Sequence, residues 1–153
     1  MFRNFTLAIA LALITSACSQ NSDVPNDPKK VLNAYISKSF AVKGVADRAE
    51  LVTLLTRDAK ARLSAWSDEQ FRQAFIDNKR EFVKLVFTES KNTSPSETNI
   101  TYELTYVDQG KGSGAKVTQK KMAQLIQDQG KWMISDVQSI KEMVEYKNEM
   151  ALP

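Results

Sequence analysis

The side chains able to do chemistry in this chain come from a short list of residue types. The 153-residue sequence contains no histidine and a single cysteine, Cys18. Histidine-based catalytic triads, histidine-ligated zinc, multi-cysteine metal sites and intrachain disulfides are therefore excluded. Any catalysis would have to use carboxylates, Tyr, Lys, Ser or Thr, and we expect neither a metal nor another cofactor.

The candidate pocket residues are mostly aromatic. They are Tyr35, Trp66, Tyr102, Tyr106, Trp132 and Ile134. Each tyrosine carries a hydroxyl that needs a hydrogen-bond partner when buried, so one inside a cavity would orient a ligand, although cross-strand packing is the simpler interpretation. Trp132 and Ile134 alternate on one predicted strand and form either the core, which we favour, or a pocket wall. Trp66 lies between helical segments, where it either closes a pocket mouth or makes an ordinary packing contact.

The composition is that of an ordinary globular domain without a basic patch. Hydrophobic residues make up 42% of the chain and charged residues 25%, and the formal net charge is +3. Lys and Arg are scattered among Asp and Glu, which argues against nucleic acid as a partner. A chain of this length suits one domain, which buries roughly two-thirds of its unfolded surface and needs no metal or disulfide.

The amino-terminal segment has the three parts of an export signal. Arg3 supplies a positive charge, residues 7–14 form an apolar run, and small residues follow at positions 15–17. A helix needs about 20 apolar residues to span a bilayer, so this shorter run predicts no permanent transmembrane helix.

Residues 14–18 read ITSAC and resemble the lipobox of bacterial lipoproteins, except for a threonine where that family prefers Leu, Val or Ile. The resemblance implies that a signal peptide, residues 1–17, is removed between Ala17 and Cys18, and that Cys18 carries acyl chains such as palmitate. Two or three chains would anchor the protein durably to a membrane of the cell envelope. In a host with two membranes, Ser19 resembles an outer-membrane signal, so the domain would face the periplasm. The alternative is an ordinary secretory peptide with an accidental cysteine.

Helical patterns follow a polar segment. Residues 18–27 predict a lipidated, flexible tether, and residues 28–153 the single folded domain. Asp27 before Pro28 predicts a helix start, and apolar residues at helical spacing continue the helix to near Gly44. Further helix starts are predicted at Asp47 with Glu50, at Arg57, and at Ser67 with Gln70.

The hydrophobic period then changes from that of helices to that of strands. Strands are predicted at 82–87, 100–106, 116–127 and 132–140, with a polar turn over 91–99, a glycine-rich loop at 110–114 and a tight turn at 128–131. Helices first and hairpin-linked strands afterwards predict an α+β fold. We expect the N-terminal helices to pack on one face of an antiparallel sheet of about four strands.

Three stretches together resemble the nuclear-transport-factor-2-like (cystatin-like) superfamily. They are Leu54 to Lys60, Ser67 to Phe71, and the run GKWMISDV at 130–137. The resemblance covers roughly residues 28–146. More narrowly, the sequence is similar to small bacterial lipoproteins of that fold without an assigned function. It implies a curved sheet that wraps the helices into a cone whose open end often holds a pocket.

The resemblance leaves three functions open. We favour a non-enzymatic envelope lipoprotein that binds a small apolar ligand or another envelope protein. A second is a cofactor-free isomerase, cyclase or hydratase, because some members of the superfamily use a pocket Asp or Tyr. The carboxylates here would be Asp136 and Glu103, but Glu103 should face solvent, and the pattern ending in Asp136 recurs in members without known activity. A third is a structural component of an envelope assembly.

Overall fold

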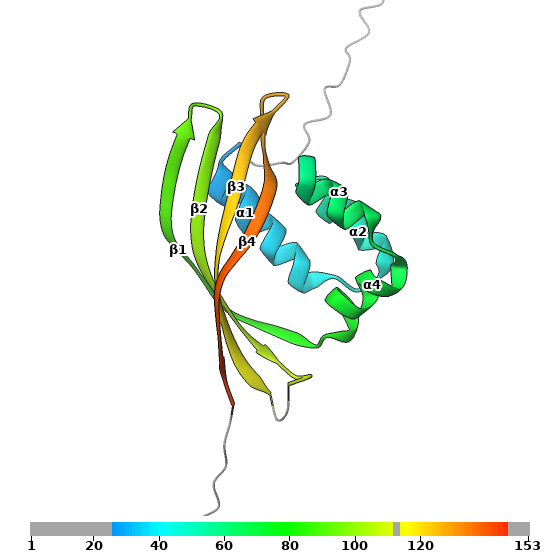
Figure 1. Ribbon diagram of the computed structural model, residues 1–153. Coiled ribbons are helices and arrows are strands. Elements are labelled where there is room, and N and C mark those ends of the chain that lie inside the picture. Colours follow the sequence, from blue (N-terminus) through cyan, green and yellow to red (C-terminus); the bar gives the residue numbers. More distant parts are fainter. Residues whose placement is uncertain (1–25, 112–113, 147–153) are drawn as a thin grey trace, which may run out of the picture.

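The computed structural model describes residues 26–111 and 114–146. Within them a layer of helices covers one face of a twisted antiparallel sheet of four strands, in the order β1-β2-β3-β4 (Figure 1). The predicted α+β class and the four-stranded sheet are confirmed. The predicted signal peptide, Cys18 and most of the tether lie outside the described residues. None of the described helices is long and apolar enough to cross a membrane.

The helical half precedes the sheet in the sequence. It comprises α1 (Pro28–Ala41), the 3-10 turn η1 (Val45–Asp47), α2 (Arg48–Val52), α3 (Arg57–Ala65), α4 (Asp68–Arg72) and the π turn η2 (Gln73–Asp77). Helix α1 begins as predicted, because a carboxylate oxygen of Asp27 accepts a hydrogen bond from the backbone N–H of Lys30 at 3.0 Å.

Helices begin after Asp47 and after Ser67 as predicted, but of these two residues only Ser67 caps its helix with its side chain. At the start of α4, the Ser67 hydroxyl accepts from the backbone of Gln70, and the Gln70 side chain accepts from the backbone of Ser67. Asp47 does not cap α2. Its carboxylate turns back and accepts from the backbone N–H groups of Lys43 and Gly44, at 2.8 and 3.1 Å, and these bonds lower the pKa of Asp47.

The strands are longer than the hydrophobic pattern predicts. They are β1 (Arg80–Ser94), β2 (Glu97–Asp108), β3 (Ala115–Asp128) and β4 (Lys131–Glu145). The polar turn predicted over residues 91–99 is confined to Pro95 and Ser96, because β1 and β2 stay paired until Ser94 lies opposite Glu97. The last strand likewise continues past Ile140. An antiparallel ladder satisfies backbone groups whatever the polarity of the side chains, so polar residues do not end a strand.

The core lies between the sheet and the helices. The predicted alternation on β2 is confirmed, since Ile100, Tyr102, Leu104 and Tyr106 are each no more than 8% exposed. They belong to one apolar cluster with residues of every α-helix, among them Leu32, Leu51, Leu63 and Phe71.

Backbone hydrogen bonds tie the helical layer to the edge strand β4. The N–H of Ile134 donates to the carbonyl of Leu54 at 3.0 Å, and the N–H of Thr56 donates to the carbonyl of Ile134 at 2.9 Å. The connection between α2 and α3 therefore forms a short parallel bridge with β4. This bridge joins the helical layer to the edge of the sheet.

The turn between β3 and β4 requires unusual backbone angles. Gln129 and Gly130 have φ values of 50° and 79°. Positive φ at both central residues is typical of the two-residue turns that suit the twist of a hairpin. The predicted tight turn at 128–131 is confirmed.

Replacing Gly130 with Ala should lower the free energy of unfolding by about 1–2 kcal/mol, because a Cβ disfavours the left-handed conformation. The added carbon meets no atom within 4 Å, so the loss is a backbone effect. Gly44→Ala is the matched control, since its added carbon also meets nothing and its φ is −152°. Urea unfolding measures both variants, and equal losses would contradict the prediction.

Candidate functional site

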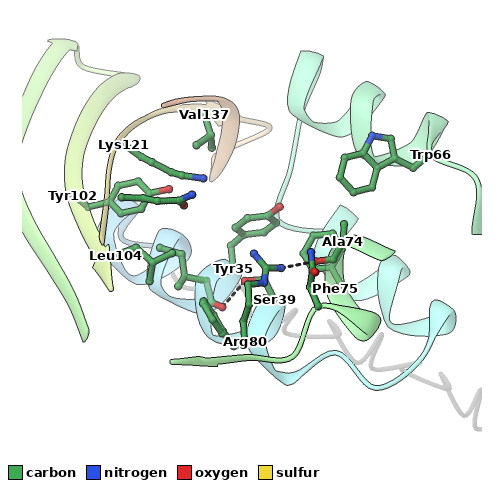
Figure 2. Close-up of a pocket in the computed structure, with 14 residues that line it drawn as sticks. Tyr35, Ser39, Trp66, Ala74, Phe75, Arg80, Tyr102, Leu104, Lys121 and Val137 are labelled. Carbon is green, nitrogen blue, oxygen red and sulfur yellow. Dashed lines mark hydrogen bonds between the residues drawn. The ribbon is translucent and has the colours of Figure 1, made fainter. Parts of the chain in front are cut away.

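A cavity of about 460 Å³ lies between the sheet and the helices (Figure 2). Its walls come from α1, the α3–α4 connection, η2, the start of β1, and the middle of β2, β3 and β4. They are formed by Tyr35, Ile36, Ser39, Phe40, Trp66, Ala74, Phe75, Asn78, Arg80, Tyr102, Leu104, Gln119, Lys121 and Val137. A second space of about 130 Å³ shares Tyr35, Trp66, Phe75 and Val137 with it, so the two adjoin.

Strand alternation brings two polar side chains to the floor of the cavity. In the register of β2 with β3, Lys121 lies opposite Tyr102 and Gln119 lies opposite Leu104. The next inward positions along β3, Val117 and Ala123, are fully buried. A lysine and a glutamine therefore occupy positions of the helix-facing side where apolar packing would otherwise continue.

Arg80 enters the cavity from the beginning of β1. Its guanidinium donates a hydrogen bond to the carbonyl of Ala74 in η2. It also lies 5.7 Å from the ring centre of Phe40 and 5.6 Å from that of Tyr106. These contacts hold the positive charge at a fixed place, with aromatic faces on two sides.

The two cations of the lining have no acidic partner within hydrogen-bonding reach. Neither Arg80 nor Lys121 forms an ion pair within residues 26–111 and 114–146. Burial lowers the pKa of Lys121, and the positive charge of Arg80 lowers it further, whereas Glu142 partly opposes both effects. Glu142 itself accepts hydrogen bonds from Gln119 at 2.6 Å and Lys111 at 3.4 Å.

Two tyrosine hydroxyls of the lining remain available as hydrogen-bond donors. Burial raises the pKa of Tyr35 and that of Tyr102, so both side chains stay protonated at neutral pH. Neither hydroxyl has a hydrogen-bond partner in the described part of the chain. Figure 2 shows Tyr102 and Lys121 side by side on the sheet, with Trp66 and Phe75 across the cavity on the helical side.

The structure divides the six candidate pocket residues into two groups. Tyr35, Trp66 and Tyr102 line the cavity, and the other three do not. Tyr106 is buried in the core beside Arg80. Ile134 and Trp132 occupy the same face of β4, where Ile134 is fully buried in the core and Trp132 packs against that core. Trp132 and Ile134 therefore pack in or against the core, which is the role we favoured for them, and form no part of the pocket wall.

Neither candidate carboxylate reaches the cavity. Asp136 is ion-paired with Arg62 of α3, whose hydrogen bond lowers the pKa of Asp136. Glu103 lies opposite Lys120 in the register of β2 with β3, on the sheet face away from the helices. Among the residues that the structure describes, no cluster of three or more His, Cys, Asp or Glu side chains forms a metal site.

Sequence analysis missed Arg80 and Lys121. For Lys121 a signal was present, because an alternation that includes Val117, Ala123 and Leu125 also places residue 121 on the inner face. Arg80 had no comparable signal, because its position depends on the turn η2 and on contacts with α1.

Comparisons with known proteins identify a similar fold and no family. No protein-family model matches the sequence, and no curated protein matches it. Among solved structures, the intermembrane-space region of the chloroplast protein ARC6 superposes with a TM-score of 0.50 and 14% sequence identity. The match covers 74% of this chain and 96% of that one. At this identity the likeness concerns the fold alone.

Replacing Lys121 with Met should raise the free energy of unfolding at pH 7 by up to about 1 kcal/mol, since desolvation and Arg80 both disfavour the charged native lysine. Lys120→Met, on the opposite face of the same strand, removes an equal charge and should change stability less. Urea unfolding compares the variants, and a Lys121→Met protein less stable than the wild type would contradict the prediction.

The difference in unfolding free energy between Lys121→Met and the wild type should decrease as the pH rises. The unfolded chain binds the Lys121 proton more tightly, with a pKa near the ordinary 10.5, than the native protein does. The charged lysine therefore destabilises the native protein fully below the native pKa, and this effect disappears as the pH rises to 10.5. The advantage of Lys121→Met over the wild type should shrink across that interval.

Proposed function

We propose that this chain is a lipid-anchored protein of the cell envelope whose domain binds a small ligand in the cavity between sheet and helices. The cavity itself is the observation that carries this proposal. Its volume of about 460 Å³ falls within the roughly 300–1,000 Å³ typical of small-molecule sites. Its wall combines aromatic rings with a few convergent polar groups, which is the composition such sites have.

A nuclear-transport-factor-2-like cone is the fold we propose for the domain. Support comes from the twisted sheet, the helices on one of its faces, and a cavity bounded by both layers. Register shifts in β1 and β4 bend these edge strands, as a sheet that wraps around helices requires.

Binding accounts for this cavity better than catalysis by a pocket carboxylate or tyrosine does. No Asp or Glu is among the described residues that line it, so it holds no carboxylate base. Its tyrosines have raised pKa values and would be poor proton acceptors at neutral pH. What the lining offers is apolar surface with two cations, hydroxyls and two side-chain amides that can form hydrogen bonds with a ligand.

The anchor rests on the sequence at residues 14–18. A cleaved signal peptide and an acylated Cys18 would hold the domain beside a membrane, in the outer membrane if the host has two. The tether of about nine residues would reach on the order of 15–18 Å as a flexible coil. The domain would then work close to the lipid surface.

Mass spectrometry of the mature protein tests the anchor. We expect a chain that begins at Cys18 and carries acyl chains, with labelled palmitate incorporated by the wild type and not by Cys18→Ala. Retention of residues 1–17, or an unmodified thiol at Cys18, would contradict this part of the proposal and leave the cavity unaffected.

The cavity is tested through the two tryptophans of the chain. With Trp132→Phe, the remaining Trp66 lines the cavity, and we expect its fluorescence to change with 4-phenylbutanol, 4-phenylbutanamide or 4-phenylbutanoate. With Trp66→Phe, the remaining Trp132 lies outside the cavity, and its emission should stay constant.

A blocking variant gives the second control for the cavity. Ala74→Phe places a ring in the lining and should abolish the response of Trp66 while the protein stays folded. A panel in which no compound changes Trp66 emission, or in which Ala74→Phe has no effect, would contradict ligand binding in this cavity.

A further inference from the structure

We infer that the ligand of the cavity is an organic anion, with its carboxylate, phosphate or sulfate group between Arg80 and Lys121 and its apolar body toward Trp66 and Phe75. This inference rests on the proposed binding function and names the class of ligand. It follows from the charges of the lining, the available donors and the distribution of apolar surface.

The charge of the lining is positive and uncompensated at short range. Arg80 and Lys121 are the charged side chains of the lining, and both are partly buried. Elsewhere in the described chain, cations do pair with acids, as Lys38 does with Glu50 at 2.6 Å. The acid with an electrostatic effect on Lys121 is Glu142, whose side chain is 43% exposed and bonded to other side chains.

Holding these two cations together is unfavourable in the empty protein. Each loses part of its hydration, and each raises the energy of the other, which is why the pKa of Lys121 is lowered. Charge-assisted hydrogen bonds to an anion would compensate both effects. Perturbed groups that face a cavity are typical of functional sites, where stability is given up for binding.

The neutral polar groups of the lining match the same ligand chemistry. The hydroxyls of Tyr35 and Tyr102 have no partner in the described chain and point into the cavity, as Figure 2 shows. Tyr102 lies directly across the β2–β3 ladder from Lys121. An ionised carboxylate, phosphate or sulfate only accepts hydrogen bonds, and both hydroxyls can donate to it. The amides of Asn78 and Gln119 in the lining can donate and accept, so the preference for an anion over a neutral alcohol or amide comes from the two cations.

The rest of the lining suits an apolar or aromatic body. The rings of Trp66 and Phe75 lie 6.0 Å apart, and Phe75 stacks on the buried Phe71 at 4.7 Å. Beyond them, the adjoining space of about 130 Å³ is lined largely by apolar side chains, including Leu55 and Leu63. An anion of about one ring or a short chain would place its charge beside the sheet and its body beside the helices.

Calorimetric titration of the full acylated chain in nonionic detergent tests the inference with two matched probes. 4-Phenylbutanoate and 4-phenylbutanamide have nearly the same shape and differ in charge. At pH 7 we expect the carboxylate to bind at least about tenfold more tightly than the amide, as a charged hydrogen bond predicts.

Two lysine variants locate the effect. Lys121→Met should weaken binding of the carboxylate about tenfold and leave the amide unchanged. Lys120→Met lowers the net charge equally but lies on the outer face of β3, so it should change neither affinity. Because Lys121→Met relieves an unfavourable charge, its loss of binding would not reflect unfolding, which a thermal melt verifies.

The outcomes separate this inference from the proposed function. Equal affinities for the two probes, or equal effects of Lys121→Met and Lys120→Met, would overturn the inference that the ligand is an anion. They would leave the proposed ligand binding intact. Failure of both probes to bind the wild type would overturn both proposals.

A third probe distinguishes the source of the anion. Octanoate carries the same carboxylate on an alkyl chain, as a lipid-derived acid does. Tighter binding of octanoate than of 4-phenylbutanoate would identify a lipid-derived ligand, and the reverse order a soluble aromatic acid. In either case the binding must weaken with Lys121→Met.

Discussion

Every second side chain of β2 and β3 must face the helices, because successive residues of a strand point to opposite sides of the sheet. Most of these inward positions are apolar and buried, as Ile100 and Ala123 are. The bridge between Ile134 and the α2–α3 connection joins the helical layer to the edge of the sheet. Where the alternation presents Lys121, an ammonium group cannot be packed against apolar atoms without a large desolvation cost. Lys121 lies instead beside the open space of the cavity.

Local chemistry explains which elements could be predicted from the sequence. The caps at Asp27 and Ser67 and the turn at Gly130 depend on residues within a few positions of each other, and all three are confirmed. The side-chain cap predicted at Asp47 is wrong because its carboxylate accepts hydrogen bonds from the backbone N–H groups of the preceding Lys43 and Gly44. The length of the β1–β2 hairpin depends on pairing between distant residues, so a polar run looked like a loop.

The candidate site was harder to predict because a cavity is a property of packing. Tyr35, Trp66 and Tyr102, three of the six candidate residues, line the cavity, whereas Ile134 lies in the core and the equally aromatic Trp132 packs against it. Residue type alone cannot separate the two roles. The proposed anchor and the proposed cavity ligand rest on separate parts of the chain. If both proposals hold, the domain is held near a membrane and captures small anions with an apolar body.

The pKa of Lys121 tests most directly whether the cavity holds an uncompensated positive charge that an anion completes. NMR of the lysine Cε and Hε signals, assigned with Lys121→Met, measures this pKa in the free protein and with saturating 4-phenylbutanoate. We expect the free value to lie below the ordinary 10.5 and to rise when the anion binds. A free value at or above 10.5, or one that the anion leaves unchanged, would contradict the central claim.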